Sequence, residues 1–372
     1  MSSSRPLSFL AVAGEASGDR HGSEVLARLG QLEPQASFFG LGMDCMIHQG
    51  LELSGDPSVL GVVGLSEAVS GLRRAHELLR RLLEQARSRR PAAALLIDVP
   101  DFNLPLARGL QRLGIPVVYY IAPQAWAWRR GRVKKLRRRV SRLCVVFPFE
   151  KDFFAAHGID VEYVGHPLAG RIHPAEEGDP DRVLLLPGSR RREIDRLLPP
   201  MLQAARLLQR HNPHLHFVLA PGISLEPGWL EKQVPEDELC LRLEDPGAAT
   251  RLLPGSRLAI CASGTVTLEA ALAGVPQVVI YKVSRLTYLL ASLLVRIPYV
   301  CIVNILAGRQ LVPELLQGRA RPECIAVSAQ MLLDRGAARQ RVLQGYRQLR
   351  QQLQHADPAG RVARALLEVA GR

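Results

Sequence analysis

Short apolar runs that alternate with longer helical patterns constrain the fold of this chain more than any other feature. Such alternation is typical of β–α–β units, in which parallel strands are connected through helices. In the first half we expect strands at Leu7–Ala13, Ala92–Asp98, Ile115–Ile121 and Leu143–Phe147. In the second half we expect them at Arg182–Leu186, Leu215–Ala220, Leu258–Ala262 and Gln277–Tyr281. The pattern predicts an α/β protein with parallel sheets.

Helical periodicity and chain breakers suggest how these units are grouped. We expect helices at about Gly22–Leu29, closed by Gly30, at Glu193–Arg210 and at Thr265–Ala273. Segment 167–181 holds three prolines and two glycines, which marks a linker. The 372 residues suit two domains. We therefore expect two Rossmann-like domains, residues 1–166 and 182–340, facing across a cleft, and a helical tail at 341–372. Whether this tail crosses back to the first domain stays open.

Charge and cysteine usage narrow the range of partners. The formal charge of +13 favours polyanions such as nucleic acid, an anionic membrane or phosphorylated substrates. Aromatic residues make up only 5% of the chain, which argues against a nucleic-acid binder that stacks bases. The six cysteines are scattered without a C-x-x-C pair, as in a reduced cytosolic protein. No run approaches the ~20 apolar residues of a membrane span, so we expect any membrane contact to be peripheral.

Two loops in the second half have the composition of nucleotide-binding turns. In the first, Gly188 and Ser189 lie between a strand and a helix, with Arg190 at the turn. Free backbone N–H groups, the positive helix end and a guanidinium can together hold a diphosphate. The spacing is not that of a P-loop, so nucleotide hydrolysis is not indicated. A capped helix with a solvated basic first turn would have the same sequence.

The second loop holds Ser263, Gly264 and Thr265, and Glu269 follows about one turn into the next helix. A carboxylate there can accept hydrogen bonds from both hydroxyls of a ribose. Helix capping by Ser263 or Thr265, with the acid complementing the helix dipole, is the alternative. Two such loops in one half favour a nucleoside diphosphate site at the carboxyl edge of the sheet.

The first half offers a turn and an aspartate. The turn Gly14–Asp19, with Glu15, Ser17, Gly18 and Asp19, lacks dinucleotide-binding spacing; it either receives a sugar or sugar phosphate or is a capped tight turn. Asp98 ends an apolar strand, so its carboxylate should lie at the carboxyl edge of the sheet. Partial burial there would raise its pKa and make it a general base. For Asp98, and more so for Asp101, turn formation is the alternative.

Metal-binding patterns are lacking, whereas basic stretches are prominent. Asp179–Asp181 reads D-x-D but precedes a strand, and the ten histidines show no paired spacing. Segment 72–90 predicts an amphipathic arginine-rich helix, which either lies on anionic lipid or is a solvated outer helix. Segment 129–142 has nine Lys or Arg residues and follows Trp126 and Trp128; phosphates, a membrane or water could face it.

Taken in order, several motifs match one known family. They are Gly14–Asp19, Asp98–Asn103, Gly165–Pro167, Leu186–Arg190, Ala262–Thr265, Pro298–Tyr299 with Asn304–Gly308, and Pro313–Gln317. The chain resembles the lipid-A-disaccharide synthases over nearly its whole length. The arginine-rich helix after Gly64 is a departure from the family, whose members vary at that helix.

The resemblance implies a GT-B fold with the nucleotide on the second domain. It also implies an inverting transfer from UDP-2,3-diacylglucosamine to 2,3-diacylglucosamine 1-phosphate, without cofactor or metal, giving lipid A disaccharide 1-phosphate and UDP. Asp98 matches the family's catalytic aspartate, and Arg190, Glu269 and Asn304 match donor-binding positions. The Gly14–Asp19 turn would face the acceptor.

The resemblance also bears on location and partners. Acylated substrates imply peripheral contact with the cytoplasmic face of the inner membrane, and no nucleic-acid partner. The oligomeric state stays open. The rival interpretations are another UDP-sugar transferase or epimerase of this fold, and a basic membrane-surface binding protein without activity.

Overall fold

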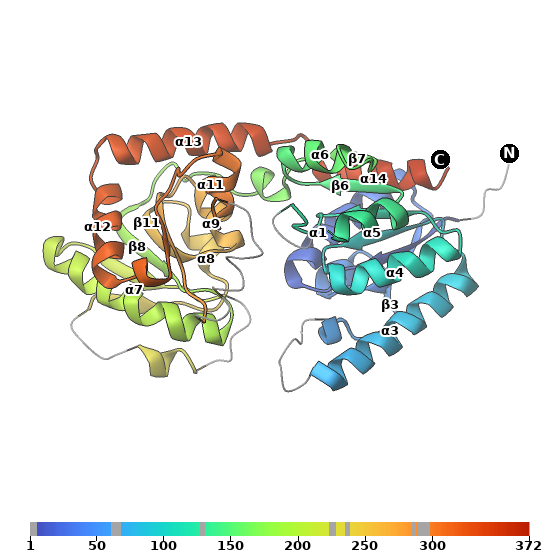
Figure 1. Ribbon diagram of the computed structural model, residues 1–372, viewed down its shortest axis with the longest axis horizontal. Coiled ribbons are helices and arrows are strands. Elements are labelled where there is room, and N and C mark those ends of the chain that lie inside the picture. The colour runs from blue at the N-terminus through green and yellow to red at the C-terminus, as the bar shows by residue number, and fades with distance from the viewer. Residues whose placement is uncertain are drawn as a thin grey trace. The chain divides into compact units, whose positions relative to one another are not determined.

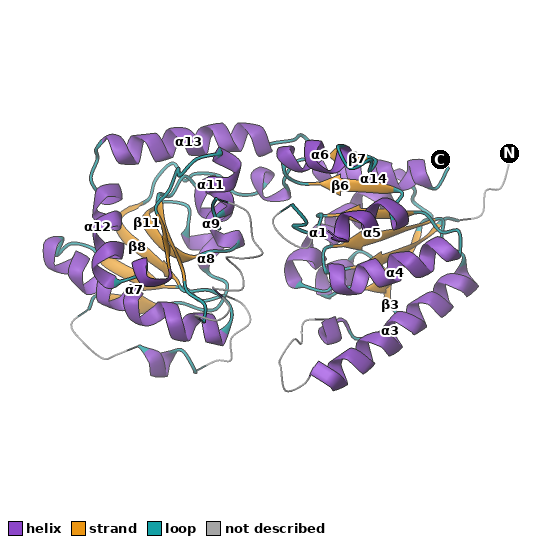
Figure 2. Ribbon diagram, in the orientation of Figure 1, coloured by secondary structure: helices purple, strands orange, loops and turns teal. Residues whose placement is uncertain are grey.

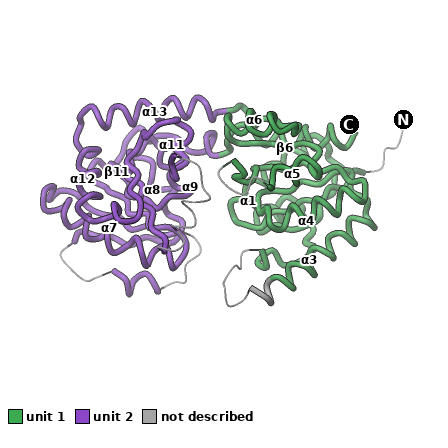
Figure 3. The backbone as a smooth tube through the Cα atoms, in the orientation of Figure 1, with its two compact units in different colours: residues 1–167, 355–372 green, residues 168–354 purple. Residues whose placement is uncertain are grey.

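The computed structural model describes residues 6–60, 68–126, 131–222, 228–234, 239–284, 288 and 298–371. The chain divides into two compact units, both with helices packed on a parallel sheet (Figures 2 and 3). Unit 1 contains residues 1–167 and 355–372, and unit 2 contains residues 168–354. Both sheets are parallel throughout, as the sequence predicted.

Unit 1 is built on a seven-stranded sheet with the order β3-β2-β1-β4-β5-β6-β7. Its strands are β1 (Ser8–Val12), β2 (Ser37–Leu41), β3 (Leu51–Leu53), β4 (Ala93–Ile97), β5 (Val117–Tyr120), β6 (Arg142–Val145) and β7 (Val161–Tyr163). The order reverses direction between β1 and β4, where Val12 pairs with Leu96. Ligands of doubly wound sheets bind at such a switch point, outside the carboxyl ends of the strands.

Alternate residues of the unit 1 strands face two separate helical layers (Figure 1). Leu10 and Val12 belong to a core with α3 (Ala68–Arg89), α4 (Pro100–Arg112) and α5 (Gly131–Arg139). Phe9 and Ala11 belong to a core with α1 (Ala16–Leu32) and α14 (Pro358–Val369). The unit is completed by η1 (Pro57–Leu60), α2 (Asp44–His48) and α6 (Pro148–Ala155).

Helix α1 differs from the sequence expectation at both ends. It begins at Ala16 instead of Gly22 and continues through Gly30 to Leu32, so Gly30 does not cap it. Gly22 serves close packing: a Cβ atom at this position would lie 2.6 Å from Met46 Sδ and 2.9 Å from Ile97 Cδ1. Gly22, which was expected at the start of the helix, lies inside it and lets the helix approach β4.

Unit 2 repeats the plan with a six-stranded sheet in the order β10-β9-β8-β11-β12-β13. Its strands are β8 (Asp179–Leu186), β9 (His216–Leu219), β10 (Leu241–Leu243), β11 (Ser256–Ala262), β12 (Gln277–Tyr281) and β13 (Glu314–Leu316). Its helices are η2 (Pro167–Gly170, which begins at the last residue of unit 1), α7 (Arg191–His211), η3 (Glu231–Gln233), α8 (Ala249–Leu252), α9 (Thr265–Leu272), α11 (Ile302–Ala307), η4 (Gln317–Arg319), α12 (Pro322–Leu333) and α13 (Ala337–Leu353).

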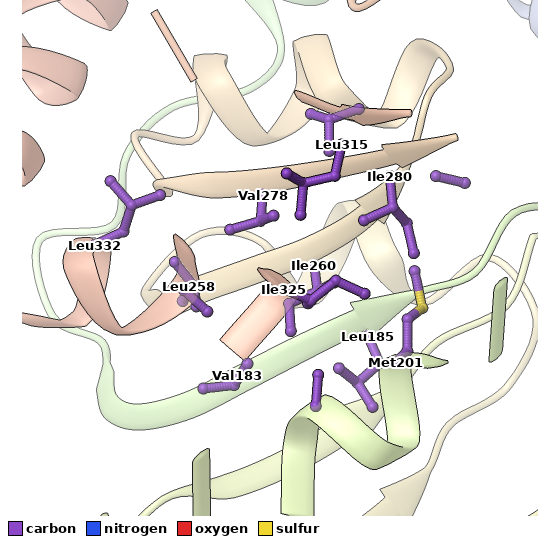
Figure 4. Close-up of a cluster of buried hydrophobic side chains, with 14 of the residues drawn as sticks. Val183, Leu185, Met201, Leu258, Ile260, Val278, Ile280, Leu315, Ile325 and Leu332 are labelled. Carbon is purple, nitrogen blue, oxygen red and sulfur yellow. The ribbon is translucent and has the colours of Figure 1, made fainter. Parts of the chain in front are cut away.

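The core of unit 2 joins its sheet to the covering helices. Figure 4 shows strand residues such as Val183 and Ile260 packed with Met201 of α7 and Ile325 of α12. Here too the strand order reverses once, between β8 and β11, where Leu186 pairs with Cys261. The loops after these two strands therefore lie side by side.

The unit boundaries differ from the expected ones. Unit 2 begins at Leu168 and β8 already at Asp179, inside the segment expected to be a linker. The guanidinium of Arg350 on α13 donates to the carbonyls of Ala169 and Ile172, which ties this segment to unit 2. The tail is divided: α13 belongs to unit 2, whereas α14 packs on α1 in unit 1.

Candidate active site

The carboxyl edge of the unit 1 sheet brings the loops after β1 and β4 together. A Cβ atom at Gly14 would lie 2.9 Å from Val99 Cγ2 and 3.0 Å from Leu60 Cδ1. A side chain at Gly14 would force these neighbouring side chains to shift, since real Cβ atoms rarely lie this near to other heavy atoms. Two segments that the sequence placed 84 residues apart, at Gly14 and Asp98, therefore meet at the switch point.

The turn after β4 has an unusual backbone. Asp98 and Val99 both lie in the left-handed region, with φ values of 47° and 41°. This region is costly for a β-branched residue, and such strain concentrates at functional sites. The Asp98 carbonyl accepts from Tyr119 Oη at 2.5 Å and from Asn103 Nδ2 at 2.8 Å. These two bonds hold the strained turn in place.

The environment of Asp98 changes its acidity. Burial and the nearby Glu15 carboxylate raise the pKa of Asp98 to about 6, against the opposing effects of the Val99 N–H and Arg132. At pH 7 such a group is still about nine-tenths ionised, yet is a stronger base than an ordinary aspartate. The side chain can therefore take a proton from a hydroxyl group.

Arg132 is a site residue that sequence reasoning did not single out. Its Nη2 lies 2.7 Å from Asp101 Oδ1, and its side chain is only 11% exposed whereas that of Asp101 is 77% exposed. Among nine cations in fourteen positions, no local pattern separated it from its neighbours. The structure thus pairs the predicted Asp101 with a buried cation that also faces Asp98.

The residues of the Gly14–Asp19 turn have different environments. Glu15 and Ser17 are exposed at the start of α1, and Gly18 is buried. Asp19 is 2% exposed, and its carboxylate accepts the N–H groups of Met43 (2.6 Å), Cys45 (3.0 Å) and Met46 (3.2 Å). Asp19 therefore caps the N-terminus of α2, which engages both of its carboxylate oxygens in a structural role. Contact of Asp19 with the acceptor stays a prediction.

In unit 2, the glycine turn leads from β8 into α7. Gly188 has φ of 110°, a conformation that favours glycine. Arg190 is the exposed N-cap residue of α7, so its guanidinium and the first N–H groups of the helix belong to one turn. Gly222 packs on the other side: its N–H donates to Gly188 O at 3.0 Å, and a Cβ there would lie 2.3 Å from Ser189 Cβ.

The loop after β11 leads into α9 in a similar way. Gly264, in an extended conformation, is the N-cap, and both Gly264 and Thr265 are exposed. Ser263 Oγ donates to Val300 O at 3.3 Å. Glu269 is half-buried and its Oε2 accepts from Thr250 Oγ1 at 2.7 Å, so Thr250 orients this carboxylate. Predicted donor residues from two distant segments thus share one sheet edge.

Asn304 does not belong to this exposed edge. It is fully buried, and its Oδ1 accepts from the N–H groups of Leu311 and Val312 at 2.8 and 2.9 Å. Its Nδ2 donates to Val312 O and to Glu314 Oε2, both at 3.1 Å. These internal bonds give Asn304 a structural role, and its contact with a donor stays a prediction. Its connection to the donor loop is indirect: Glu314 accepts from the N–H of Val300, whose carbonyl binds Ser263.

Within the residues that the structure describes, no group of three or more His, Cys, Asp or Glu side chains is arranged to hold a metal ion. No helix among them has both the length and the apolar character to cross a membrane.

Comparison with solved structures gives the fold class. The fold is similar to that of the calicheamicin glycosyltransferase, with 17% identity, 99% of both chains covered and a TM-score of 0.63. It is also similar to the glycotransferase of kitacinnamycin (16% identity, 98% and 100% covered, TM-score 0.67). A UDP-GlcNAc 2-epimerase from Neisseria meningitidis bound to UDP-GlcNAc matches at 12% identity, 97% and 99% coverage and a TM-score of 0.63. Two Rossmann-like units of this kind define the GT-B fold.

Sequence comparison gives the family. Residues 9–365 match the model of the lipid-A-disaccharide synthetase family. The lipid-A-disaccharide synthase of Myxococcus xanthus is 40% identical, with 98% of each chain covered. That of Anaeromyxobacter dehalogenans strain 2CP-1 is 43% identical, with 97% of each covered. The chain belongs to the lipid-A-disaccharide synthase family and is a glycosyltransferase of lipid A biosynthesis.

Proposed function

We propose that the protein transfers 2,3-diacylglucosamine from its UDP conjugate to 2,3-diacylglucosamine 1-phosphate, releasing UDP and forming a β-1,6-linked disaccharide 1-phosphate. Family membership supports the reaction class. The observation that carries the chemistry is Asp98, a strained, largely buried carboxyl whose pKa is raised to about 6 at the switch point of unit 1. Its environment suits a general base more than a turn former.

Asp98 accepts the proton of the acceptor's primary hydroxyl as that oxygen attacks the anomeric carbon of the donor. The bond from this carbon to the β-phosphate oxygen breaks, and its electron pair leaves with UDP. Attack from the face opposite the leaving group inverts the configuration at the anomeric carbon. Glu15, exposed and close to Asp98, forms the acceptor-facing turn together with Ser17 and Gly18. Asp101 acts together with Arg132.

The edge of unit 2 stabilises the departing diphosphate. The N–H groups at Gly188, Ser189 and Arg190, the positive end of α7 and the Arg190 guanidinium all favour the negative charge that develops on it. Glu269 binds the ribose hydroxyls, and Ser263, Gly264 and Thr265 complete the donor loop. None of these roles requires a metal ion or a cofactor.

The decisive assay combines the purified protein with both diacylated substrates. We expect disaccharide 1-phosphate and UDP in equal amounts. Conversion of the UDP-sugar alone into an isomer would instead identify an epimerase, which the fold also accommodates. Absence of either product, from protein that still binds UDP, would refute the proposed reaction.

We also propose that unit 1 contacts the cytoplasmic face of the inner membrane peripherally. The layer of α3, α4 and α5 carries fourteen Arg or Lys residues against three acids, a net charge of +11. On the opposite face of the sheet, α1 and α14 together carry only +1. Burial and the guanidiniums of Arg108, Arg112 and Arg138 lower the pKa of Arg139, a sign of crowded positive charge. Such a surface attracts acidic headgroups.

Vesicle sedimentation tests the membrane contact. We expect binding to phosphatidylglycerol vesicles, little binding to phosphatidylcholine vesicles, and loss of binding at high salt. Reversing two α5 charges, Lys134→Glu with Lys135→Glu, should weaken binding about tenfold or more. The control Arg364→Glu on α14 should have a much smaller effect. Equal loss in the control would contradict the assignment of this layer.

A further inference from the structure

A carboxylate of the chain itself occupies the glycine turn that we assign to the donor's diphosphate. Glu193 is the third residue of α7, and its side chain turns back over the loop after β8. A Cβ atom at Gly188 would lie 2.1 Å from Glu193 Oε2 and 2.6 Å from its carboxyl carbon. The carboxylate therefore fills the space that a side chain at position 188 would need.

The carboxylate faces the same hydrogen-bond donors that a phosphate would use. Glu193 faces the backbone N–H groups of Ser189 and Arg190, as a glutamate does in the third position of a capped helix. Burial raises the pKa of Glu193, while these N–H groups and the Arg190 guanidinium act in the opposite direction. Tyr281, at the end of β12, also faces the carboxylate: burial and then the charge of Glu193 raise the pKa of Tyr281. A diphosphate and the Glu193 carboxylate would compete for one set of N–H groups.

The side chain of Glu193, and not the backbone of the turn, is the part of this arrangement that can move. The turn is fixed from its other side, where Gly222 hydrogen-bonds Gly188 O and packs on Ser189. The Glu193 side chain, in contrast, is only half-buried and can change its conformation by rotation about its side-chain bonds. Two anions side by side in a partly buried turn repel each other, so binding of one favours departure of the other.

We propose that Glu193 is a resident competitor of the donor's diphosphate, and that donor binding displaces its carboxylate from the Gly188–Arg190 turn. This inference rests on the proposed function, because it takes that turn as the diphosphate site. Without donor, the carboxylate accepts hydrogen bonds from the N–H groups of the turn and so maintains the conformation of the turn. After transfer, the returning carboxylate promotes release of UDP.

Replacement of Glu193 by glutamine tests the competition, because glutamine keeps the shape and one carbonyl acceptor but removes the charge. By calorimetry, we expect Glu193→Gln to lower the Kd for UDP about tenfold and to leave the Kd for uridine unchanged. Uridine serves as the control ligand because it has no phosphate. Asp195→Asn, which removes a charge from an exposed position of the same helix, should change the UDP Kd less than about twofold.

Unchanged or weaker UDP binding by Glu193→Gln, with normal uridine binding, would overturn the inference. If the wild-type protein bound neither ligand, the proposed function would fail instead. A structure of the wild-type protein with UDP gives a second test that requires no variant. We expect the Glu193 carboxylate to have left Gly188, and a diphosphate bound in this turn beside an undisplaced Glu193 would refute the proposal.

Discussion

The two sheets follow the same strand order, apart from the additional strand β7 in unit 1, but the loops at their carboxyl edges differ in chemistry. In unit 1 the loop after β4 presents Asp98, held in a strained turn beside Glu15, so that its pKa is raised. In unit 2 the loop after β8 presents a glycine turn, a helix N-terminus and Arg190, all suited to an anion. In the function that we propose, the same frame therefore supplies a base in one unit and an anion site in the other. The loops, more than the sheets, decide the chemistry.

Removal of the Asp98 carboxylate should distinguish the role of the unit 1 sheet edge from that of the unit 2 sheet edge most clearly. Asp98→Asn should lower kcat about 1,000-fold, because general-base catalysis contributes about 10²- to 10⁴-fold. The Kd for UDP should stay within about twofold, since the anion site belongs to the other unit. Steady-state kinetics and calorimetry measure both quantities. Asp101→Asn is the matched control, with a smaller loss of kcat expected; equal losses would remove the distinction between these aspartates.

A buried structural residue should affect stability more than binding. Asn304→Ala leaves the N–H groups of Leu311 and Val312 without acceptors, which we expect to cost about 3 kcal/mol of unfolding free energy. Urea unfolding measures this change. If the variant instead kept its stability and lost UDP affinity, the assignment of Asn304 to the packing of unit 2 would be wrong.

Removal of the cation from the anion site should affect binding alone. Arg190→Ala should raise the Kd for UDP about thirtyfold, because a charge-assisted hydrogen bond contributes about 2 kcal/mol. Uridine binding should change little. Arg192→Ala, an exposed arginine in the first turn of the same helix, provides the control. Equal effects of the two variants would indicate a diffuse field instead of a specific contact.

Ionisation of Asp98 should also lower the free energy of unfolding. Its pKa is about 6 in the folded protein against an ordinary value of 3.8, so the unfolded chain releases this proton first as pH rises. Stability is therefore lost between about pH 4 and 6, by at most about 3 kcal/mol. Asp98→Asn should be more stable than the wild type at pH 7 and equal to it near pH 3.5. An equal difference at both values would contradict the raised pKa.

The sheet and the loops around it were predictable because their signals are local. Apolar runs marked most strands, and the strand-to-helix turns placed Asp98 and Gly188 at sheet edges. The direction of a side chain was not predictable, because its partners lie far along the chain. Asp19 turns inward to cap a helix that starts at residue 44, and Asn304 binds residues 311–314. Arg132 could not be distinguished from the neighbouring Arg and Lys residues in the sequence, because its ion pair with Asp101 is formed only in the folded protein.

The pH dependence of kcat/KM tests most directly whether the unit 1 edge supplies the base. Only the ionised form of Asp98 accepts a proton, so the wild-type value should rise with pH and reach a plateau above a midpoint of about 6. The residual activity of Asp98→Asn should lack this rise. A wild-type profile without an inflection near pH 6, or the same inflection retained in the variant, would contradict the account.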